Sequence, residues 1–261
     1  MTRQPCAHGL PLGAGGRVTM SVVPLAAIEG TGLTDFLTEA ELAVSRMHRI
    51  PGRRTAHLAG RVAVKLAVLD STRRSTRTLE AREIGVTQMM AGPEQGRPIV
   101  QLPAGIPPCD VSISHSQALA VAVIATVGRV GVDIEFITPR TTAFIDEVFT
   151  ASEQAWLREF GIRLGRNVDD VWSLGWCIKE AMVKCTGHGL RDPLQQVNFS
   201  GWVEQKVVGM PWICDTPTSV ARLVTLATPG STAAPTTGLI ALSRGYAWAI
   251  LHGEPGLRPR S

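Results

Sequence analysis

Residues 176–190 read WCIKEAMVKCTGHGL, and this stretch places three charged side chains among apolar ones. The three are Lys179, Glu180 and Lys184, and lysine and glutamate are seldom fully buried unless they are paired. The common interpretation is a helix with a Glu–Lys pair on its solvated face, which contributes about a few tenths of a kcal/mol. The alternative is a helix that presents these charges to a functional site, and the rest of the chain decides between the two.

The flanking residues predict that this stretch is the C-terminal part of a helix. Asn167 has a side chain that can cap the first turn, and Gly187 is the residue type that commonly ends a helix. Trp176, Glu180 and Lys184 recur at steps of four, so they form one ridge at the edge of the apolar stripe of this helix.

Length and composition indicate a globular protein of one large domain or two small ones. The chain has 261 residues, 18% of them charged, and a mean hydropathy of +0.12. No run approaches the roughly 18 apolar residues of a membrane span, and Pro24 interrupts the best apolar stretch near the N-terminus, which argues against a signal peptide. Residues 1–19 are predicted to be a loose leader, with Met20 as an alternative start.

Five cysteines without a CxxC pair argue against a disulfide framework or a zinc site and indicate the cytoplasm.

The order of helical and strand-like segments indicates an α+β fold with two similar halves, each with helices packed on an antiparallel sheet. The first half is predicted to span 20–128 and the second 129–261. Within them the expected helices cover about 36–48, 53–70, 152–160 and 167–187, and strand-like segments follow each helical pair.

Basic residues concentrate in the first half of the chain. Between residues 46 and 82 the sequence holds ten arginines and lysines against Asp70 and Glu80. Arg54, Arg61 and Lys65 are spaced seven and four apart, which places them on one helical stripe. This concentration favours an acidic partner or a phosphate-bearing ligand, and an ordinary solvated helix face is the alternative.

Two carboxylates stand on one face of the strand-like segment RVGVDIEFI at 129–137. Alternation places Gly131, Asp133 and Glu135 together, with the two acidic residues about 7 Å apart at the backbone. Mg²⁺ prefers such hard oxygen ligands, and it usually binds one or two carboxylates together with water and a substrate phosphate. Gly131 removes bulk where a ligand could approach. The alternative is the polar face of a half-exposed strand.

The segment SHS at 114–116 closes a neighbouring strand-like segment. Ser114 and His115 have side chains that bond phosphate or ribose, although a lone histidine is more often structural. No GxSxG sequence surrounds either serine, so a hydrolase triad has little support.

Three motifs in this order resemble the 4′-phosphopantetheinyl transferases, specifically the larger pseudodimeric, surfactin-synthetase-activating type. They are SHS at 114–116, GVDIE at 131–135 and W-x-x-K-E-x-x-x-K-x-x-G-x-G-L at 176–190. Further segments that are similar to the family are LTEAE at 37–41, AGRVAVK at 59–65, GRP at 96–98 and FTASEQAWL at 149–157. The likeness spans about residues 35–200.

The resemblance implies the 4′-phosphopantetheinyl transferase fold and a transfer that depends on Mg²⁺, with Mn²⁺ as an alternative. The phosphopantetheine arm of coenzyme A would move to a serine hydroxyl of an apo acyl or peptidyl carrier protein of a polyketide or non-ribosomal peptide synthetase, releasing 3′,5′-ADP. The active site would lie between the two halves of a cytoplasmic monomer that binds neither nucleic acid nor membranes. The rivals are a non-catalytic coenzyme A or nucleotide-binding module and a metal-dependent phosphohydrolase.

The resemblance also implies roles for single residues. Asp133, Glu135 and Glu180 would hold the metal, with Glu180 as the base, and Lys184 would contact a pyrophosphate oxygen or the departing phosphate. Asp133, Glu180 and Lys184 would be the catalytic residues.

The remaining implied residues would contact coenzyme A. They are Arg97 at the adenosine part, Ser114 and His115 at the nucleotide end, Lys179 as a supporting residue, and Lys184. Ala56 stands where the family often has an arginine for the 3′-phosphate, so Arg53 or Arg54 is expected to replace it.

Overall fold

The computed structural model describes most of the chain, in ranges that are separated by short gaps. The described residues are 4–10, 12, 17–30, 32–73, 77–187, 194–199, 202–207, 220–226 and 236–253. They fall into two compact units, Met1–Val130 and Gly131–Ser261, against an expected boundary after residue 128. Both units combine helices with antiparallel strands, which confirms the predicted α+β class.

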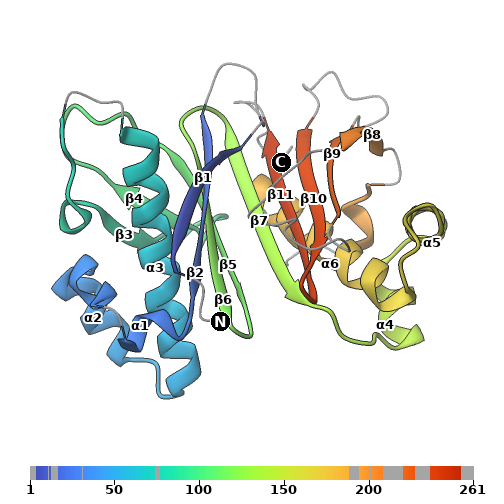
Figure 1. Ribbon diagram of the computed structural model, residues 1–261, viewed down its shortest axis with the longest axis horizontal. Helices are drawn as coiled ribbons and strands as arrows, with labels where there is room; N and C mark the ends of the chain where they lie inside the picture. The colour runs from blue at the N-terminus through green and yellow to red at the C-terminus, as the bar shows by residue number, and fades with distance from the viewer. Residues whose placement is uncertain are drawn as a thin grey trace. The chain divides into compact units, whose positions relative to one another are not determined.

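The first unit is built on a four-stranded antiparallel sheet with the order β1-β2-β6-β5. Its strands are β1 (Cys6–Leu10), β2 (Val18–Pro24), β5 (Asp110–Ser116) and β6 (Leu119–Ala125), and β3 (Gly85–Gln88) pairs with β4 (Pro98–Gln101) as a separate hairpin. Its helices are α1 (Ala27–Gly30), α2 (Glu39–Arg46) and α3 (Pro51–Thr72), with 3₁₀ turns at Leu33–Phe36 and Ala81–Glu83. The long helix α3 packs along the sheet and buries an apolar core against it (Figure 1).

The N-terminal segment differs from the predicted loose leader. Strand β1 pairs with β2, which begins two residues before Met20 and is buried along its whole length. Strand β2 lies between β1 and β6 and against α3, so its apolar residues form part of the core. Strand β1 has little local signal, because CAHGL contains none of the residues that favour strands, which are Val, Ile, Thr, Tyr, Phe and Trp.

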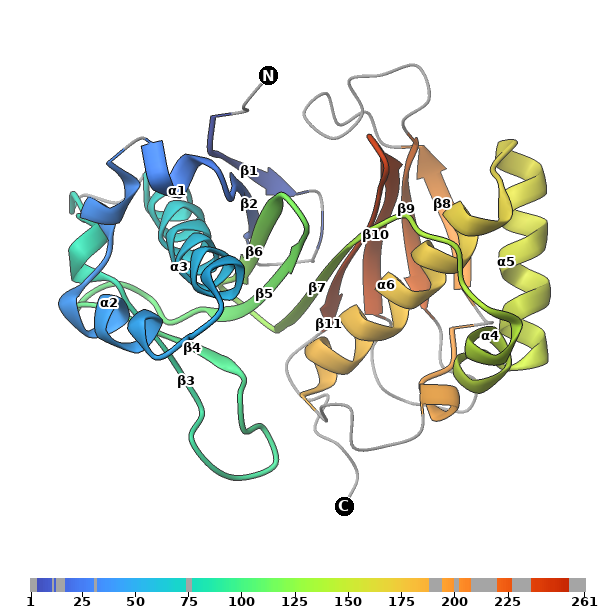
Figure 2. The same ribbon diagram turned by 90° about the horizontal axis from the view of Figure 1, so that it is seen from below.

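The second unit has a five-stranded sheet with the order β7-β11-β10-β9-β8. Its strands are β7 (Arg129–Phe136), β8 (Trp202–Val207), β9 (Val220–Leu226), β10 (Thr236–Ser243) and β11 (Tyr246–Gly253). Its helices are α4 (Thr142–Val148), α5 (Ala151–Leu164) and α6 (Val168–Thr186), with a 3₁₀ turn at Leu194–Gln196. Helix α6 crosses one face of this sheet and packs on β10 and β11, as Figure 2 shows.

The two units share an order of strands. In the first unit β2 neighbours the last strand, β6, which neighbours β5; in the second, β7 neighbours the last strand, β11, which neighbours β10. In each unit the longest helix, α3 or α6, follows the first of these three strands in sequence and precedes the other two. It packs on the sheet of its own unit. This correspondence supports the interpretation of two similar halves.

Helix α6 begins and ends as its sequence predicts. The Asn167 side chain accepts a hydrogen bond from the backbone N–H of Asp170 at 2.8 Å, and Gly187 ends the helix with a φ of 81°. That left-handed conformation favours glycine over residues with a Cβ atom. Within the described residues, no helix combines the length and the apolar composition that crossing a membrane requires.

Candidate active site on α6 and β7

Helix α6 lies directly against strand β7 at Gly131. A Cβ atom at this position would lie 1.9 Å from the carbonyl oxygen of Ala181 and 2.6 Å from the backbone nitrogen of Cys185. The missing side chain therefore makes room for the helix backbone, and not for a ligand as the sequence suggested. Because Asp133 and Glu135 follow Gly131 on the same face of the strand, this contact brings them to the side of α6 that carries Glu180.

Lys184 bonds to strand β7 instead of to its own helix. Its Nζ donates to Asp133 Oδ1 at 2.7 Å and to the backbone oxygen of Val132 at 3.1 Å. The Asp133 side chain is 6% exposed and that of Lys184 is 28% exposed, so the pair is largely shielded from water. The ridge on α6 is therefore not the solvated Glu–Lys pair that is common on helices.

Glu180 has a carboxylate oxygen that requires a partner. Its Oε1 is buried and, among the residues that the structure describes, meets no hydrogen-bond donor. An unsatisfied buried polar group costs about 1–3 kcal/mol. Burial raises the pKa of Glu180, the charges of Asp133 and Glu135 raise it further, and the Lys184 ammonium opposes them.

Glu135 belongs to the same electrostatic neighbourhood. Burial raises the pKa of the Glu135 carboxyl, and the charge of Asp133 adds to that effect. Arg140 lies 3.7 Å from Glu135 Oε2 and lowers the pKa in opposition. Three carboxylates from β7 and α6 thus repel one another, with Lys184 and Arg140 as partial counter-charges.

The three carboxylates fit a hard divalent cation by donor type and by charge. Mg²⁺ prefers carboxylate oxygens, and Glu180 Oε1 is a buried acceptor without a donor. No three His, Cys, Asp or Glu side chains in the described part of the chain are grouped closely enough to hold a metal ion as they stand. In this arrangement Lys184 and Arg140 instead supply positive charge to two of the three carboxylates.

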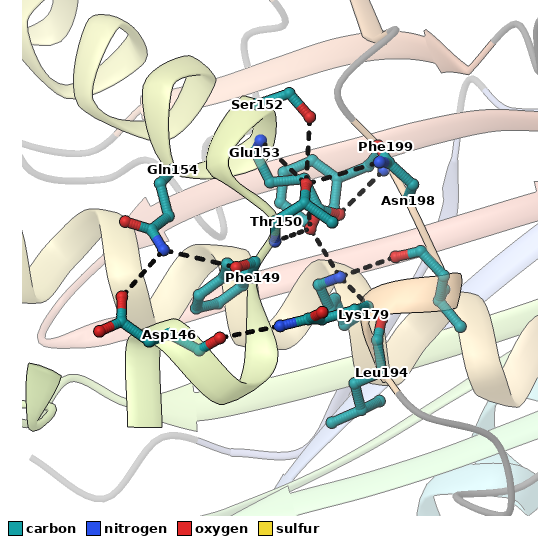
Figure 3. A network of polar contacts seen from close by, with 12 residues as sticks. Asp146, Phe149, Thr150, Ser152, Glu153, Gln154, Lys179, Leu194, Asn198 and Phe199 are labelled. Atoms are coloured by element: carbon teal, nitrogen blue, oxygen red, sulfur yellow. Dashed lines mark hydrogen bonds and ion pairs between the residues drawn. The ribbon is translucent and has the colours of Figure 1, made fainter. Parts of the chain in front are cut away.

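Lys179 is placed differently from the expected contact with coenzyme A. Its side chain is fully buried, and its Nζ lies 2.8 Å from Glu153 Oε2 (Figure 3). The same Nζ donates to the backbone oxygens of Leu194 and Val197, at 2.8 Å each. These contacts occupy all three donors of the ammonium group. Lys179 therefore fastens the segment 194–199 to α6 and has no donor left for a ligand.

Glu153 completes this network from helix α5. Its Oε2 accepts from the backbone N–H of Thr150 at 2.9 Å, which forms a capping box, and its Oε1 accepts from the backbone N–H of Phe199 at 3.1 Å. A carboxylate that is fully buried thus meets one cation and two backbone donors. Sequence reasoning missed this pair, although the T-x-x-E capping signature at 150–153 was a sign of the helix start.

The first unit contains a matching network. Lys65 Nζ lies 2.8 Å from Glu41 Oε2 and donates to the backbone oxygens of Phe36 and Ala81. Glu41 accepts from the backbone N–H groups of Thr38, in a capping box, and Val86. Lys65 is fully buried, so it does not extend the exposed basic stripe that the sequence suggested.

The acidic cluster has no counterpart in the first unit. When Lys65 is matched with Lys179, Leu66 stands in the place of Glu180 and Asp70 in the place of Lys184. The sequence of β2, VTMSVVP, contains no carboxylate to match those of β7. Among the described residues, only the second unit therefore combines the carboxylates with the lysine.

The first unit holds the other residues that were expected to contact coenzyme A. Arg53 and Arg54 are exposed in the first turn of α3. On β5, Ser114 is buried and His115 is exposed. Arg97 Nη2 lies 2.6 Å from Asp110 Oδ2, at the other end of that strand.

The separation along β5 bears on how these residues act. Five residues of extended chain span about 17 Å, so Arg97, tied to Asp110, is not brought together with His115. Asp110 Oδ2 also accepts from the backbone N–H of Val130 at 2.8 Å. Arg97, the residue before β4, is therefore tied to the start of β5, and a role at the adenosine part of a ligand stays a prediction.

A histidine pair lies near the start of α3. His48 Nε2 and His57 Nδ1 are 3.1 Å apart, which is hydrogen-bond distance for one shared proton. The pKa of His57 is lowered to about 4, mainly by burial and in addition by the nearby charges of Arg61, His48 and His115.

The lowered pKa of His57 predicts a loss of stability in weak acid. Between pH 6.5 and about 4 the unfolded chain binds a proton that the folded chain does not, so stability falls as the pH falls through this window. One proton corresponds to at most about 1.4 kcal/mol per pH unit, and the half-buried ring should show less. Urea unfolding of wild type and His57→Gln between pH 4.5 and 7.5 measures the difference. The two slopes should diverge below pH 6.5 and agree above pH 7; parallel slopes throughout would contradict the assignment.

Comparison with known proteins finds one family that is similar to part of this chain. Residues 129–227 match the model of the 4′-phosphopantetheinyl transferase superfamily. This range contains β7, α4, α5, α6, β8 and β9. The comparison with curated proteins gave no match. The chain is therefore similar to this superfamily over residues 129–227, and the matched range includes all three carboxylates and Lys184.

Proposed function

We propose that this protein transfers the 4′-phosphopantetheine arm of coenzyme A to a serine hydroxyl of an apo acyl or peptidyl carrier protein, with release of 3′,5′-ADP. The observation that carries the proposal is the Glu180 carboxylate, buried beside Asp133 and Glu135 with an oxygen that meets no donor among the described residues. The superfamily match over residues 129–227 supports the class of reaction.

Asp133, Glu135 and Glu180 would hold a divalent cation, which we propose to be Mg²⁺. When bound, such an ion neutralises charge on the pyrophosphate of coenzyme A and on the leaving group. The chain itself supplies the acidic cradle, in which Asp133 is almost fully buried and the Glu135 side chain is 31% exposed.

Glu180 is the proposed general base. The serine oxygen of the carrier attacks the phosphorus that bears the pantetheine arm, and the bond from this phosphorus to the oxygen of 3′,5′-ADP breaks. The serine proton passes to the Glu180 carboxylate. This geometry needs no internal nucleophile, since the nucleophile belongs to the partner.

Lys184 is the proposed contact to the leaving phosphate. Its ammonium group is anchored to Asp133 and Val132, yet the side chain is 28% exposed, so part of it faces solvent. An ammonium fixed in this way stabilises charge that develops on a phosphate oxygen in the transition state.

The larger pseudodimeric type remains part of the proposal. The shared strand order and the two matching Lys–Glu networks support an origin of both units from one fold. Contacts of Arg53, Arg54, Arg97, Ser114 and His115 with coenzyme A, and a coenzyme site to which both halves contribute, stay predictions.

The test is the mass of an apo carrier protein after incubation with this protein, coenzyme A and Mg²⁺. A gain equal to one phosphopantetheine group, absent when the acceptor serine is replaced by alanine, supports the proposal. Release of phosphopantetheine or phosphate from coenzyme A alone would indicate a phosphohydrolase. Binding of coenzyme A without any product would indicate a non-catalytic module.

A further inference from the structure

Arg140 is a cation beside the acidic cluster that the proposed reaction does not use. It follows strand β7 and precedes helix α4, and its side chain is 21% exposed. Its Nη2 lies 3.7 Å from Glu135 Oε2. Burial raises the pKa of the Glu135 carboxyl, and among the groups that lower this pKa Arg140 has the largest effect. Arg140 is therefore the main counter-charge of Glu135.

The two cations of the cluster hold their carboxylates differently. Lys184 donates to Asp133 at 2.7 Å, which is the length of a charge-assisted hydrogen bond. The 3.7 Å between Arg140 and Glu135 is too long for a hydrogen bond, so this pair is held by the attraction of its charges. Arg140 Nε is buried and meets no acceptor among the described residues. Arg140 thus neutralises Glu135 without a directional bond to it.

Aromatic rings support the Arg140 guanidinium. Its Cζ lies 5.1 Å from the centroid of the Phe144 ring, which is within the range of a cation–π contact. The Phe144 ring in turn packs on Trp176, with 5.3 Å between the ring centroids. A hydrogen bond from the Trp176 side chain also lowers the pKa of Glu135. The guanidinium and the carboxylate therefore contact the same aromatic pair, which keeps them close without a hydrogen bond between them.

The charge of Arg140 opposes a second cation on the same carboxylate. Two positive charges that share Glu135 repel each other, and in a partly buried site water and salt screen them little. In the part of the chain that the structure describes, no three acidic, histidine or cysteine side chains are grouped to hold a metal ion as they stand, so binding an ion requires side chains to move. Glu135 can turn from Arg140 to an ion without breaking a hydrogen bond between the two, whereas Asp133 is bonded to Lys184.

Two other roles for Arg140 fit less well. Arginine binds phosphate readily, but a phosphate that approached Arg140 here would also approach the Glu135 carboxylate, which repels it. A purely structural ion pair would gain most from close, charge-assisted hydrogen bonds, which a separation of 3.7 Å does not allow.

We propose that Arg140 competes with the divalent cation for Glu135 and thereby weakens the binding of the ion to the site. This inference rests on the metal site of the proposed transferase. Arg140 is a positioning residue in it, because it acts through Glu135 and not on the reacting atoms. Ion binding is measured without coenzyme A and without a carrier, so this inference and the transfer reaction fail separately.

The first experiment measures the Kd of the full chain for Mn²⁺ alone, from the electron paramagnetic resonance of the free ion. Arg140→Gln removes the charge and should lower this Kd by about fivefold or more. Arg140→Lys keeps the charge and should bind Mn²⁺ as wild type does. The matched control, Arg163→Gln, removes an arginine that lies over the Phe160 ring of α5 and should leave the Kd unchanged.

A double-mutant cycle tests whether the effect passes through Glu135. Glu135→Gln should weaken Mn²⁺ binding, which assigns the measured ion to this site. In that background Arg140→Gln should change the Kd less than it does in wild type, because the carboxylate for which Arg140 competes is gone.

Thermal melting with and without Mn²⁺ separates competition from support of the fold. Loss of a competitor should increase the rise in Tm that Mn²⁺ produces, because the ion then binds the folded protein more tightly. Loss of a merely supporting residue would lower the Tm by the same amount with and without the ion. Arg140→Gln should show the first pattern.

Each other outcome overturns this inference or the function on which it rests. An unchanged or raised Kd for Mn²⁺ in Arg140→Gln, or no measurable binding by either protein, overturns the competition even if transfer occurs. Binding that Glu135→Gln leaves unchanged places the ion elsewhere and also overturns it.

The conservative variant and coenzyme A supply the remaining outcomes. Equally tight Mn²⁺ binding by Arg140→Gln and Arg140→Lys assigns the effect to side-chain shape and overturns the competition. Weaker binding of coenzyme A by Arg140→Gln, with Mn²⁺ binding as in wild type, overturns it in favour of a phosphate contact. Tighter Mn²⁺ binding by Arg140→Gln, in a protein whose wild type transfers nothing, overturns the transferase function and leaves the role of Arg140 standing.

Discussion

Lys179→Met is expected to destabilise the second unit by about 3–5 kcal/mol, the cost of breaking a buried ion pair from one side. The substitution leaves the Glu153 carboxylate fully buried without its cation. It also removes the donors that hold the backbone oxygens of Leu194 and Val197. Methionine has a similar length, so the effect comes from charge and hydrogen bonding and not from a cavity.

The double variant Lys179→Met/Glu153→Gln distinguishes the cost of leaving one buried charge without its partner from the cost of removing the whole ion pair. Removing both charges should restore part of the lost stability, because an uncompensated buried charge costs more than an absent pair. Lys184→Met serves as a control, since its side chain is partly exposed and it should cost less.

Tryptophan fluorescence measures this effect selectively during urea unfolding. All six tryptophans follow Gly131, so the signal reports on the second unit. Lys65→Met breaks the matching pair of the first unit and should leave the midpoint of this signal less affected. A Lys179→Met protein within 1 kcal/mol (about fivefold) of wild type would mean that the pair is dispensable.

The sequence predicted the elements whose signals are local. Helix α6 has its cap at Asn167 and its stop at Gly187, and both follow from residue types at fixed positions. The alternation of RVGVDIEFI likewise placed Asp133 and Glu135 on one face of β7. Such features need only neighbours within a few residues of the chain.

The sequence could not show which distant groups meet. Lys179 and Glu180 are adjacent in one motif, yet their surroundings differ. Lys179 binds Glu153 and the backbone of the segment 194–199, whereas Glu180 Oε1 is buried and meets no donor among the described residues. The missing side chain of Gly131 was predicted to make room for a ligand, whereas the backbone of α6 occupies that space. Strand β1 had no local signal, since its strand form comes from pairing with β2. In each case the deciding contact joins residues far apart in the chain.

Glu180→Gln is expected to lower kcat for transfer by about 10²–10⁴-fold, the range that is typical of a lost general base. Glutamine keeps the shape of the side chain and removes both the negative charge and the basicity. The variant should fold at least as stably as wild type, because burial raises the pKa of Glu180 and its Oε1 meets no donor among the described residues. Reduced transfer with unchanged or raised stability is the signature of a residue kept for chemistry.

Two further variants place this effect in the site. Glu159→Gln removes an exposed carboxylate on α5 and should keep wild-type activity. The double variant Glu180→Gln/Lys184→Met should lose less than the product of the single losses, because both side chains are proposed to act on one transition state. Strict independence of the two effects on kcat/KM, or a Glu180→Gln enzyme within tenfold of wild type, would remove Glu180 from the chemistry. The base would then have to be sought in Asp133 or Glu135. Asp133 is already bonded to Lys184, so Glu135, whose pKa burial also raises, would be the next carboxylate to replace.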